Sequence, residues 1–146
     1  MIKYKKVDHE KVKRELVQLP SLFASIEEII AVYLFGSSGT GYIMPLSDVD
    51  IAILFKSGIS KQRMEELELR IWEELTKRLK TEEIDLVSLN SAPLRIKYGV
   101  LGTSRLVYCA DHKQRMDFEG WVIKRYLDFK PLREEYDREF LKGIGF

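Results

Sequence analysis

The stretch VYLFGSSGTGYIMPLSDVDIAIL, residues 32–54, decides the fold of this chain. An apolar strand runs into a loop that contains three glycines, and a second apolar strand then opens with two aspartates, Asp48 and Asp50. Because side chains alternate along a strand, these two aspartates share one face, with their Cα atoms about 7 Å apart. Val49 and Ile51 point the other way, into a core. Two carboxylates therefore stand where burial of the strand begins.

The other periodic segments predict an α+β fold, in which helices pack against a small mixed sheet and a helical extension follows at the C-terminus. Ser60 can cap a long helix, and Pro131 is expected to interrupt the last one. We expect helices over residues 8–19, 21–28, 60–80, 93–101, 111–128 and 132–142, and strands over 31–35, 48–55, 83–89 and 104–109. One domain is expected over 1–146, with a core at about 21–110 and the extension at about 111–146.

Composition excludes several classes of function. Lys and Arg number 24 against 23 Asp and Glu, so the net charge of +1 does not indicate nucleic-acid or anionic-membrane binding. The chain has a single cysteine, Cys109, which excludes an internal disulfide and favours a reducing compartment. No signal peptide and no membrane-length apolar run is visible. These features predict a cytoplasmic protein with no membrane contact.

The paired aspartates indicate a metal site. Two like charges on one face repel each other, and burying them is costly unless a cation neutralises them. Mg²⁺ prefers carboxylate oxygens and usually keeps phosphates and waters as further ligands. Asp85, an isolated acid in the apolar strand EIDLVSL, would face the same metals if its strand lay beside that of Asp48 and Asp50. Two metals about 4 Å apart would then serve the reaction, with Asp85 as general base or positioning group.

The loop before the aspartates suits a phosphate. Gly36 allows the backbone to approach a ligand closely, and the Ser37 hydroxyl with neighbouring N–H groups can bind phosphate oxygens. Ser47 precedes Asp48 and is expected to hydrogen-bond the turn, or alternatively the metal shell. A phosphate site and a metal site at adjacent strand ends together predict a nucleoside-triphosphate site. The alternative is a purely structural role, in which a turn is followed by a strand whose aspartates cap the loop.

These residues resemble a known signature. GSSGTGYIMPLSDVD, residues 36–50, is similar to the Gly-Ser, ten residues, Asp-x-Asp pattern of the DNA polymerase beta-like nucleotidyltransferases. In its length the chain resembles members of the minimal branch of that superfamily. Residues 91–136 resemble the C-terminal part of MntA-type antitoxins, which accompany HEPN-domain toxins of the HepT type.

The resemblance implies a palm-like sheet, Mg²⁺ at Asp48, Asp50 and Asp85, and ATP as donor. It also implies transfer of AMP to a tyrosine hydroxyl of a HEPN toxin, whose ribonuclease activity is thereby silenced. Many relatives carry an arginine in the loop where this chain has Thr40, so one cation that would help to hold the triphosphate is missing. Two alternatives stay open: an antitoxin that acts by contact alone, and nucleotidyl transfer to a small molecule such as an aminoglycoside. The oligomeric state, homo- or hetero-oligomeric, is open as well.

Aromatic residues at helical spacing are expected in the core rather than in a cofactor platform. This group comprises Phe118, Trp121, Tyr126 and Trp72. An equally weighted alternative is that some C-terminal aromatics form a surface for a partner. Cys109 and His112 are spaced like metal ligands, but two ligands without a second pair make a poor zinc site, so packing or surface roles are expected.

Overall fold

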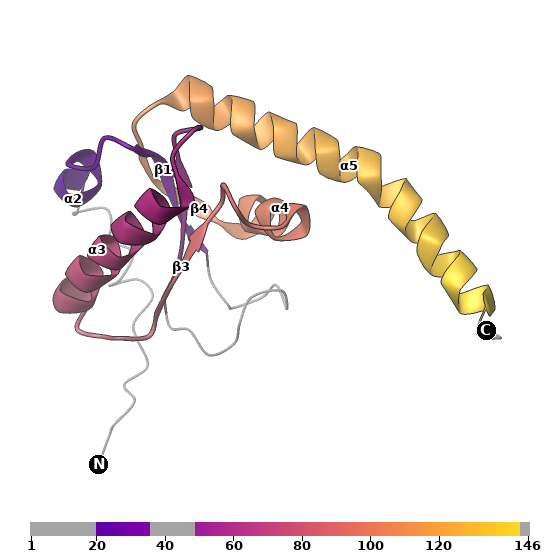
Figure 1. Ribbon diagram of the computed structural model, residues 1–146, viewed down its shortest axis with the longest axis horizontal. Helices are drawn as coiled ribbons and strands as arrows, with labels where there is room; N and C mark the ends of the chain where they lie inside the picture. The colour runs from indigo at the N-terminus through magenta and orange to yellow at the C-terminus, as the bar shows by residue number, and fades with distance from the viewer. Residues whose placement is uncertain (1–19, 36–48, 144–146) are drawn as a thin grey trace, which may run out of the picture.

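The computed structural model describes residues 20–35 and 49–143, and these form a four-stranded mixed sheet with helices on both faces (Figure 1). The strand order is β3-β2-β1-β4. Strand β1 pairs antiparallel with both β2 and β4, whereas β2 and β3 are parallel. The elements in chain order are α2 (Pro20–Ala24), β1 (Ile29–Phe35), β2 (Val49–Phe55), α3 (Lys61–Leu79), β3 (Ile84–Ser88), α4 (Leu94–Thr103), β4 (Arg105–Cys109) and α5 (His112–Gly143). The expected α+β class is confirmed.

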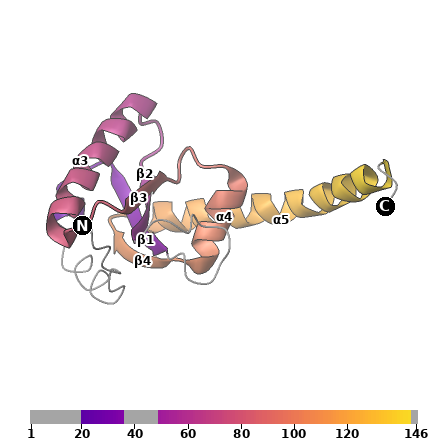
Figure 2. The same cartoon turned by 90° about the horizontal axis from the view of Figure 1, so that it is seen from below.

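Two layers of helices cover the sheet. Helices α2 and α3 lie on one face, and α4 with the first part of α5 lies on the other (Figures 1 and 2). Strand β2 is central, and all seven of its residues are buried because both of its faces are covered. Val49, Ile51 and Ile53 pack in the α2–α3 layer, whereas Ala52 and Leu54 pack in the α4–α5 layer. Alternation therefore places Asp50 on the α4–α5 side.

Helix α3 forms as its sequence predicts. Its apolar stripe of Met64, Leu67, Ile71 and Leu75 is buried against the sheet. At its first turn the Ser60 hydroxyl accepts a hydrogen bond from the Arg63 N–H, with an N–O distance of 3.1 Å. This cap satisfies one of the N–H groups that a helix start leaves without an intrahelical partner.

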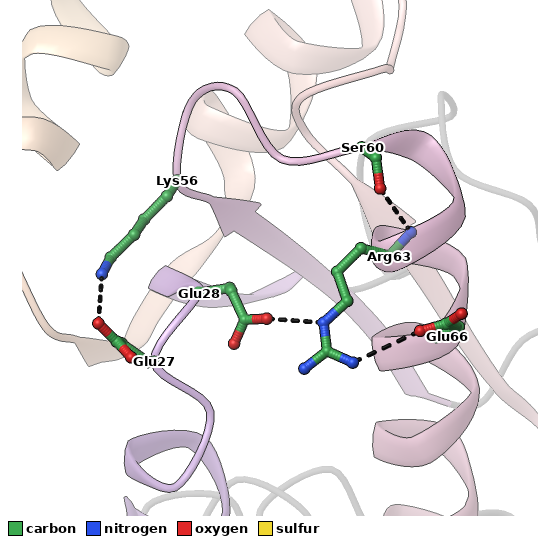
Figure 3. A network of polar contacts seen from close by, with 6 residues as sticks. All are labelled: Glu27, Glu28, Lys56, Ser60, Arg63 and Glu66. Atoms are coloured by element: carbon green, nitrogen blue, oxygen red, sulfur yellow. Dashed lines mark hydrogen bonds and ion pairs between the residues drawn. The ribbon is translucent and has the colours of Figure 1, made fainter.

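Charged residues connect the start of α3 to the start of β1 (Figure 3). The Arg63 Nε donates to Glu28 Oε2 at 2.7 Å, and a second guanidinium nitrogen lies 3.4 Å from Glu66. The hydrogen bond from Arg63 lowers the pKa of Glu28. Lys56, at the end of β2, lies 3.5 Å from Glu27. All of these side chains reach solvent, so the network orients the elements more than it stabilises them.

Three expectations about helices either differ from the structure or concern residues outside the described ranges. The helix expected over 21–28 ends at Ala24, because the chain turns at Ile26 and then enters the sheet: the Lys56 N–H donates to the Glu28 carbonyl. The helix expected over 8–19 lies outside the described residues. The predicted break at Pro131 is wrong, since α5 is one helix of 32 residues with this proline inside it.

The continuity of α5 through Pro131 has a physical reason. Proline removes one backbone hydrogen bond and pushes on the preceding turn, which bends or ends a helix. Every described residue after Tyr126 is exposed, so water can bind the released carbonyl and the helix can bend into open space. Figure 1 shows α5 changing direction part-way along its length.

Replacing Ser60 by alanine should lower the free energy of unfolding by about 1 kcal/mol, because the cap of α3 is lost while the buried stripe is untouched. Urea denaturation followed by circular dichroism measures the change. Ser57→Ala is the matched control, because Ser57 is exposed and precedes the cap by three positions. Equal stability of the two variants would contradict a capping role.

Candidate active site

Asp50 is a buried acid in the middle of the sheet. It is the second residue of β2, and its side chain is 1% exposed. Its neighbour on β1 is Phe35, and its neighbour on β3 is Asp85. Only Asp50 and Ser88 are buried polar residues among those described. A carboxylate in such a place is costly for the fold, and acids of this kind gather at functional sites.

Asp85 stands beside Asp50 because β2 and β3 are parallel and in register. The two residues are Cα partners across the ladder, so their side chains leave the sheet on the same face. Adjacent strands lie about 4.8 Å apart, which puts the two carboxyl groups within reach of one small cation. The sequence-based expectation that the Asp85 strand lies beside the Asp50 strand is confirmed.

Several contacts hold this register. At one end of the ladder the Val49 N–H donates to the Glu83 carbonyl at 3.1 Å. At the other end the Asn90 side-chain amide bonds both backbone groups of Phe55, each at 2.8 Å. These contacts lie at the two ends of the β2–β3 pair, so a slip of one residue would break both of them.

Helix α3 also contacts the outer edge of β3. The Trp72 indole Nε1 donates to the Ile84 carbonyl at 3.2 Å. This bond satisfies an edge carbonyl one residue before Asp85. Trp72 therefore acts in the packing of the protein, as expected, and it fixes the strand that carries the second acid.

Burial raises the pKa of Asp85 above its ordinary value. A half-buried carboxyl loses part of its hydration, and this loss disfavours the charged form. Such a group accepts a proton more readily than a solvated aspartate does, and it gains more from a nearby cation. Both properties suit a carboxylate in a metal-dependent active site.

The other residues expected in the site lie outside the described part of the chain. They are Gly36, Ser37, Ser47 and Asp48. Within the described residues, no group of three or more His, Cys, Asp or Glu side chains could hold a metal ion. The two described acids nevertheless fit a hard divalent cation, because they offer adjacent carboxylate oxygens on one face of the sheet. Cys109 and His112 join no metal-binding group there either.

A second polar cluster ties α5 to the sheet on the same face. The Tyr33 hydroxyl donates to Glu119 at 2.7 Å, and Arg115 donates to both oxygens of Glu119 at 3.0 Å. Burial, together with the bond to Glu119, raises the pKa of Tyr33. Sequence reasoning missed this cluster, because Tyr33 and Glu119 are 86 positions apart and no local pattern links them.

The expected core position of Trp121 is wrong. Its side chain is 50% exposed, with Lys97 and Arg125 placed over the ring at 5.4 Å and 5.6 Å from its centre. Tyr126 stacks on Tyr98 at 3.9 Å and is partly buried, and Phe118 packs against the core. Beyond this point the body of the protein ends and α5 continues.

The family model for polymerase beta nucleotidyltransferases matches residues 18–113, which is well over half of the chain. The match contains the strands of both described aspartates. The chain belongs to this family. It is accordingly a nucleotidyltransferase. No functionally curated protein matches the chain at a significant level.

Solved structures share this nucleotidyltransferase fold over nearly the whole chain. One comes from a Shewanella oneidensis complex described as a tri-AMPylated HEPN toxin with an MNT antitoxin: it is 20% identical, with a TM-score of 0.62, and the alignment covers 92% of this chain and 99% of that one. A toxin–antitoxin structure with AMP-PNP is 23% identical, with a TM-score of 0.59 and coverage of 90% and 98%. A MntA–HepT toxin–antitoxin structure is 21% identical, with a TM-score of 0.62 and coverage of 90% and 98%.

Within the described part of this nucleotidyltransferase, no helix combines the length and apolar character needed to cross a bilayer.

Asp85→Asn should stabilise the metal-free protein at pH 7 but not at pH 3. The folded state holds the Asp85 proton more tightly than the unfolded state, so stability falls as the pH rises from the unfolded pKa through the raised folded pKa. Asparagine removes this loss. We expect a rise in Tm of at most about 3 °C at pH 7 in EDTA, measured by calorimetry. Asp117→Asn, at an exposed position of α5, is the control, and a variant less stable than wild type at pH 7 would contradict the argument.

Tyr33→Phe should lower the free energy of unfolding by about 1–2 kcal/mol, because a buried hydroxyl bonded to a charged group is lost. Guanidinium denaturation provides the measurement. Tyr136→Phe, which removes a hydroxyl from an exposed tyrosine of α5, the helix that carries Glu119, should leave the free energy of unfolding unchanged. A loss of the same size in both variants would show that the contact between Tyr33 and Glu119 is not the cause.

Proposed function

We propose that this nucleotidyltransferase transfers AMP from ATP to a hydroxyl of a cognate HEPN-domain toxin, with a tyrosine as the acceptor, and so acts as an antitoxin in the cytoplasm. The observation that carries the proposal is the register of β2 and β3, which sets Asp50 directly beside Asp85 in a chain of this family. Asp48, two positions before Asp50, would complete the acidic set.

The proposed chemistry is a direct displacement. The acceptor oxygen forms a bond to the α-phosphorus of ATP, the bond from that phosphorus to the bridging oxygen breaks, and pyrophosphate leaves. The acceptor proton passes to the Asp85 carboxylate, which stands beside Asp50 on the same face of the sheet. Asp48, Asp50 and Asp85 would hold Mg²⁺, which when bound neutralises phosphate charge and favours ionisation of the acceptor.

The phosphates would be held by the loop before β2. Gly36 and Ser37 would bind phosphate oxygens, and Ser47 would support the turn that precedes Asp48. Thr40 offers no positive charge there, so the proposed ATP site has one cation fewer than that of relatives with a loop arginine. We therefore expect the metal ions to supply most of the positive charge at the triphosphate.

The structural neighbours support the choice of acceptor. Their descriptions name a HEPN toxin, a tri-AMPylated state and AMP-PNP, and their alignments cover 92% and 90% of this chain. The small-molecule alternative is weaker, because such an acceptor needs its own pocket beside the acids. The contact-only alternative leaves the cost of burying Asp50 beside Asp85 without a benefit.

A transfer assay tests the proposal. The chain, its cognate HEPN-domain protein, Mg²⁺ and α-labelled ATP are incubated, and label on the partner is followed. Asp85→Asn should slow transfer by about 10²–10⁴-fold, because asparagine cannot accept the proton, and Asp50→Asn should do the same through loss of metal binding.

Asp117→Asn, at an exposed position of α5, is the matched control and should transfer AMP at the wild-type rate. Neutralisation of the toxin by Asp50→Asn at wild-type strength would establish the contact-only antitoxin. Label that appears on an aminoglycoside but not on the protein would favour the small-molecule reaction.

A further inference from the structure

The distal half of α5 carries an apolar surface that the body of the protein does not cover. Figures 1 and 2 show α5 running past the sheet and past α4. At 1.5 Å per residue its 32 residues span about 48 Å, more than a compact domain of this size needs. Four large side chains stand on this part with exposed fractions of 52–69%: Phe129, Leu132, Tyr136 and Phe140. We call these four residues the distal stripe.

The distal stripe continues the face by which α5 packs on the domain. Phe118 and Val122 pack against the core on the proximal half, and Tyr126 stacks on Tyr98 of α4. Steps of three or four residues lead from Tyr126 to each member of the distal stripe in turn, so one helical face runs from the core into solvent. A face of this kind is typical of a helix that packs against something along its whole length.

A groove prolongs this face on the side of α4. It has a volume of about 650 Å³ and lies between α4 and α5. Tyr98 and Tyr126 line its inner end with Phe129, and cations stand along it at Arg95 and Arg133. The groove and the stripe share Phe129, so they form one continuous surface.

Charges along α5 set the two edges of the distal stripe apart. Asp128, Glu135 and Glu139 follow one edge, at helical spacing from one another. The other side is mixed in charge, because Lys130 and Arg133 line the groove there together with Glu134 and Asp137. A helix that docks on this surface would therefore match it with cations along the acidic edge and with polar residues of either sign toward the groove.

A second copy of this chain fits the surface poorly. In an antiparallel pair each edge meets the same edge of its partner, so the edge with Glu135 and Glu139 would face itself. In a parallel pair the edges would match. In that arrangement, however, the body of each copy already covers the proximal part of the same face of α5, so the two bodies would clash sterically.

We propose that the distal stripe and the α4–α5 groove bind an amphipathic helix of the acceptor protein, with basic residues along the edge that faces Asp128, Glu135 and Glu139. This inference rests on the proposed function, because it names how the protein substrate is held. Aromatic side chains at the centre of an interface carry much of its binding energy, and three of the four stripe residues are aromatic. Docking on α5 would then present the acceptor hydroxyl from the α4–α5 side of the sheet, the side of Asp50 and Asp85.

The test compares two triple variants of the full chain. The stripe variant carries Phe129→Ala, Tyr136→Ala and Phe140→Ala. The control variant carries Ile123→Ala, Leu127→Ala and Leu141→Ala, which removes exposed apolar side chains from the opposite side of the same helix. Alanine favours helix at all six positions, and circular dichroism checks that both variants are folded.

Calorimetry against the purified HEPN-domain protein should show binding at least about 30-fold weaker for the stripe variant and within about 3-fold of wild type for the control. In the transfer assay the stripe variant should raise KM for the protein acceptor and leave kcat nearly unchanged. Wild-type affinity in the stripe variant, or an equal loss in both variants, overturns the inference. So does a wild-type chain that forms a dimer by sedimentation when the stripe variant does not.

The Asp50→Asn, Asp85→Asn double variant separates this inference from the proposed function. It should bind the HEPN-domain protein like wild type and transfer no label. Tight binding through the stripe without any AMP transfer by the wild-type chain would refute the proposed function and leave the docking surface standing. Transfer by the stripe variant at an unchanged KM for the protein acceptor would refute the docking surface and leave the proposed function standing.

Discussion

The parallel pairing of β2 and β3 is the constraint on which the rest of this structure depends. It is the one parallel pair in the described sheet, and it requires the long crossover that α3 supplies. The same pairing brings Asp50 and Asp85 together, although they are 35 positions apart in the chain. Three further contacts hold β3 in place: the Asn90 amide bonds Phe55 at the end of the pair, the Trp72 indole bonds Ile84 at the outer edge, and the buried stripe of α3 packs on one face.

This arrangement works against stability and for chemistry. Burying Asp50 and partly burying Asp85 on one face costs free energy, as the raised pKa of Asp85 indicates. The cost is carried by a sheet covered on both faces, whose central strand is buried throughout. A divalent cation and a polyphosphate would turn the same pair of acids from a destabilising feature into a set of ligands.

Prediction from the sequence succeeded where local pattern and local geometry coincide. The α3 helix followed from its apolar spacing, and its start at Ser60 followed from capping chemistry. Prediction failed at Pro131 and Trp121, because rules that hold for helices packed in a domain do not apply where a helix is exposed to solvent. A proline break was expected because proline removes a backbone hydrogen bond and clashes with the preceding turn, yet α5 projects into solvent and bends instead of ending. Trp121 lies where α5 leaves the body, so half of its ring stays exposed.

The sequence by itself determined the family, the α+β class and the candidate acids, because these depend on residue types at short spacings that the chain carries directly. Only the tertiary structure decided which acids meet, through the register of two strands separated by a helix. It alone paired Tyr33 with Glu119 and left the distal stripe of α5 without a cover inside the described chain. Contacts between distant residues depend on how whole elements pack, and no local pattern encodes that packing.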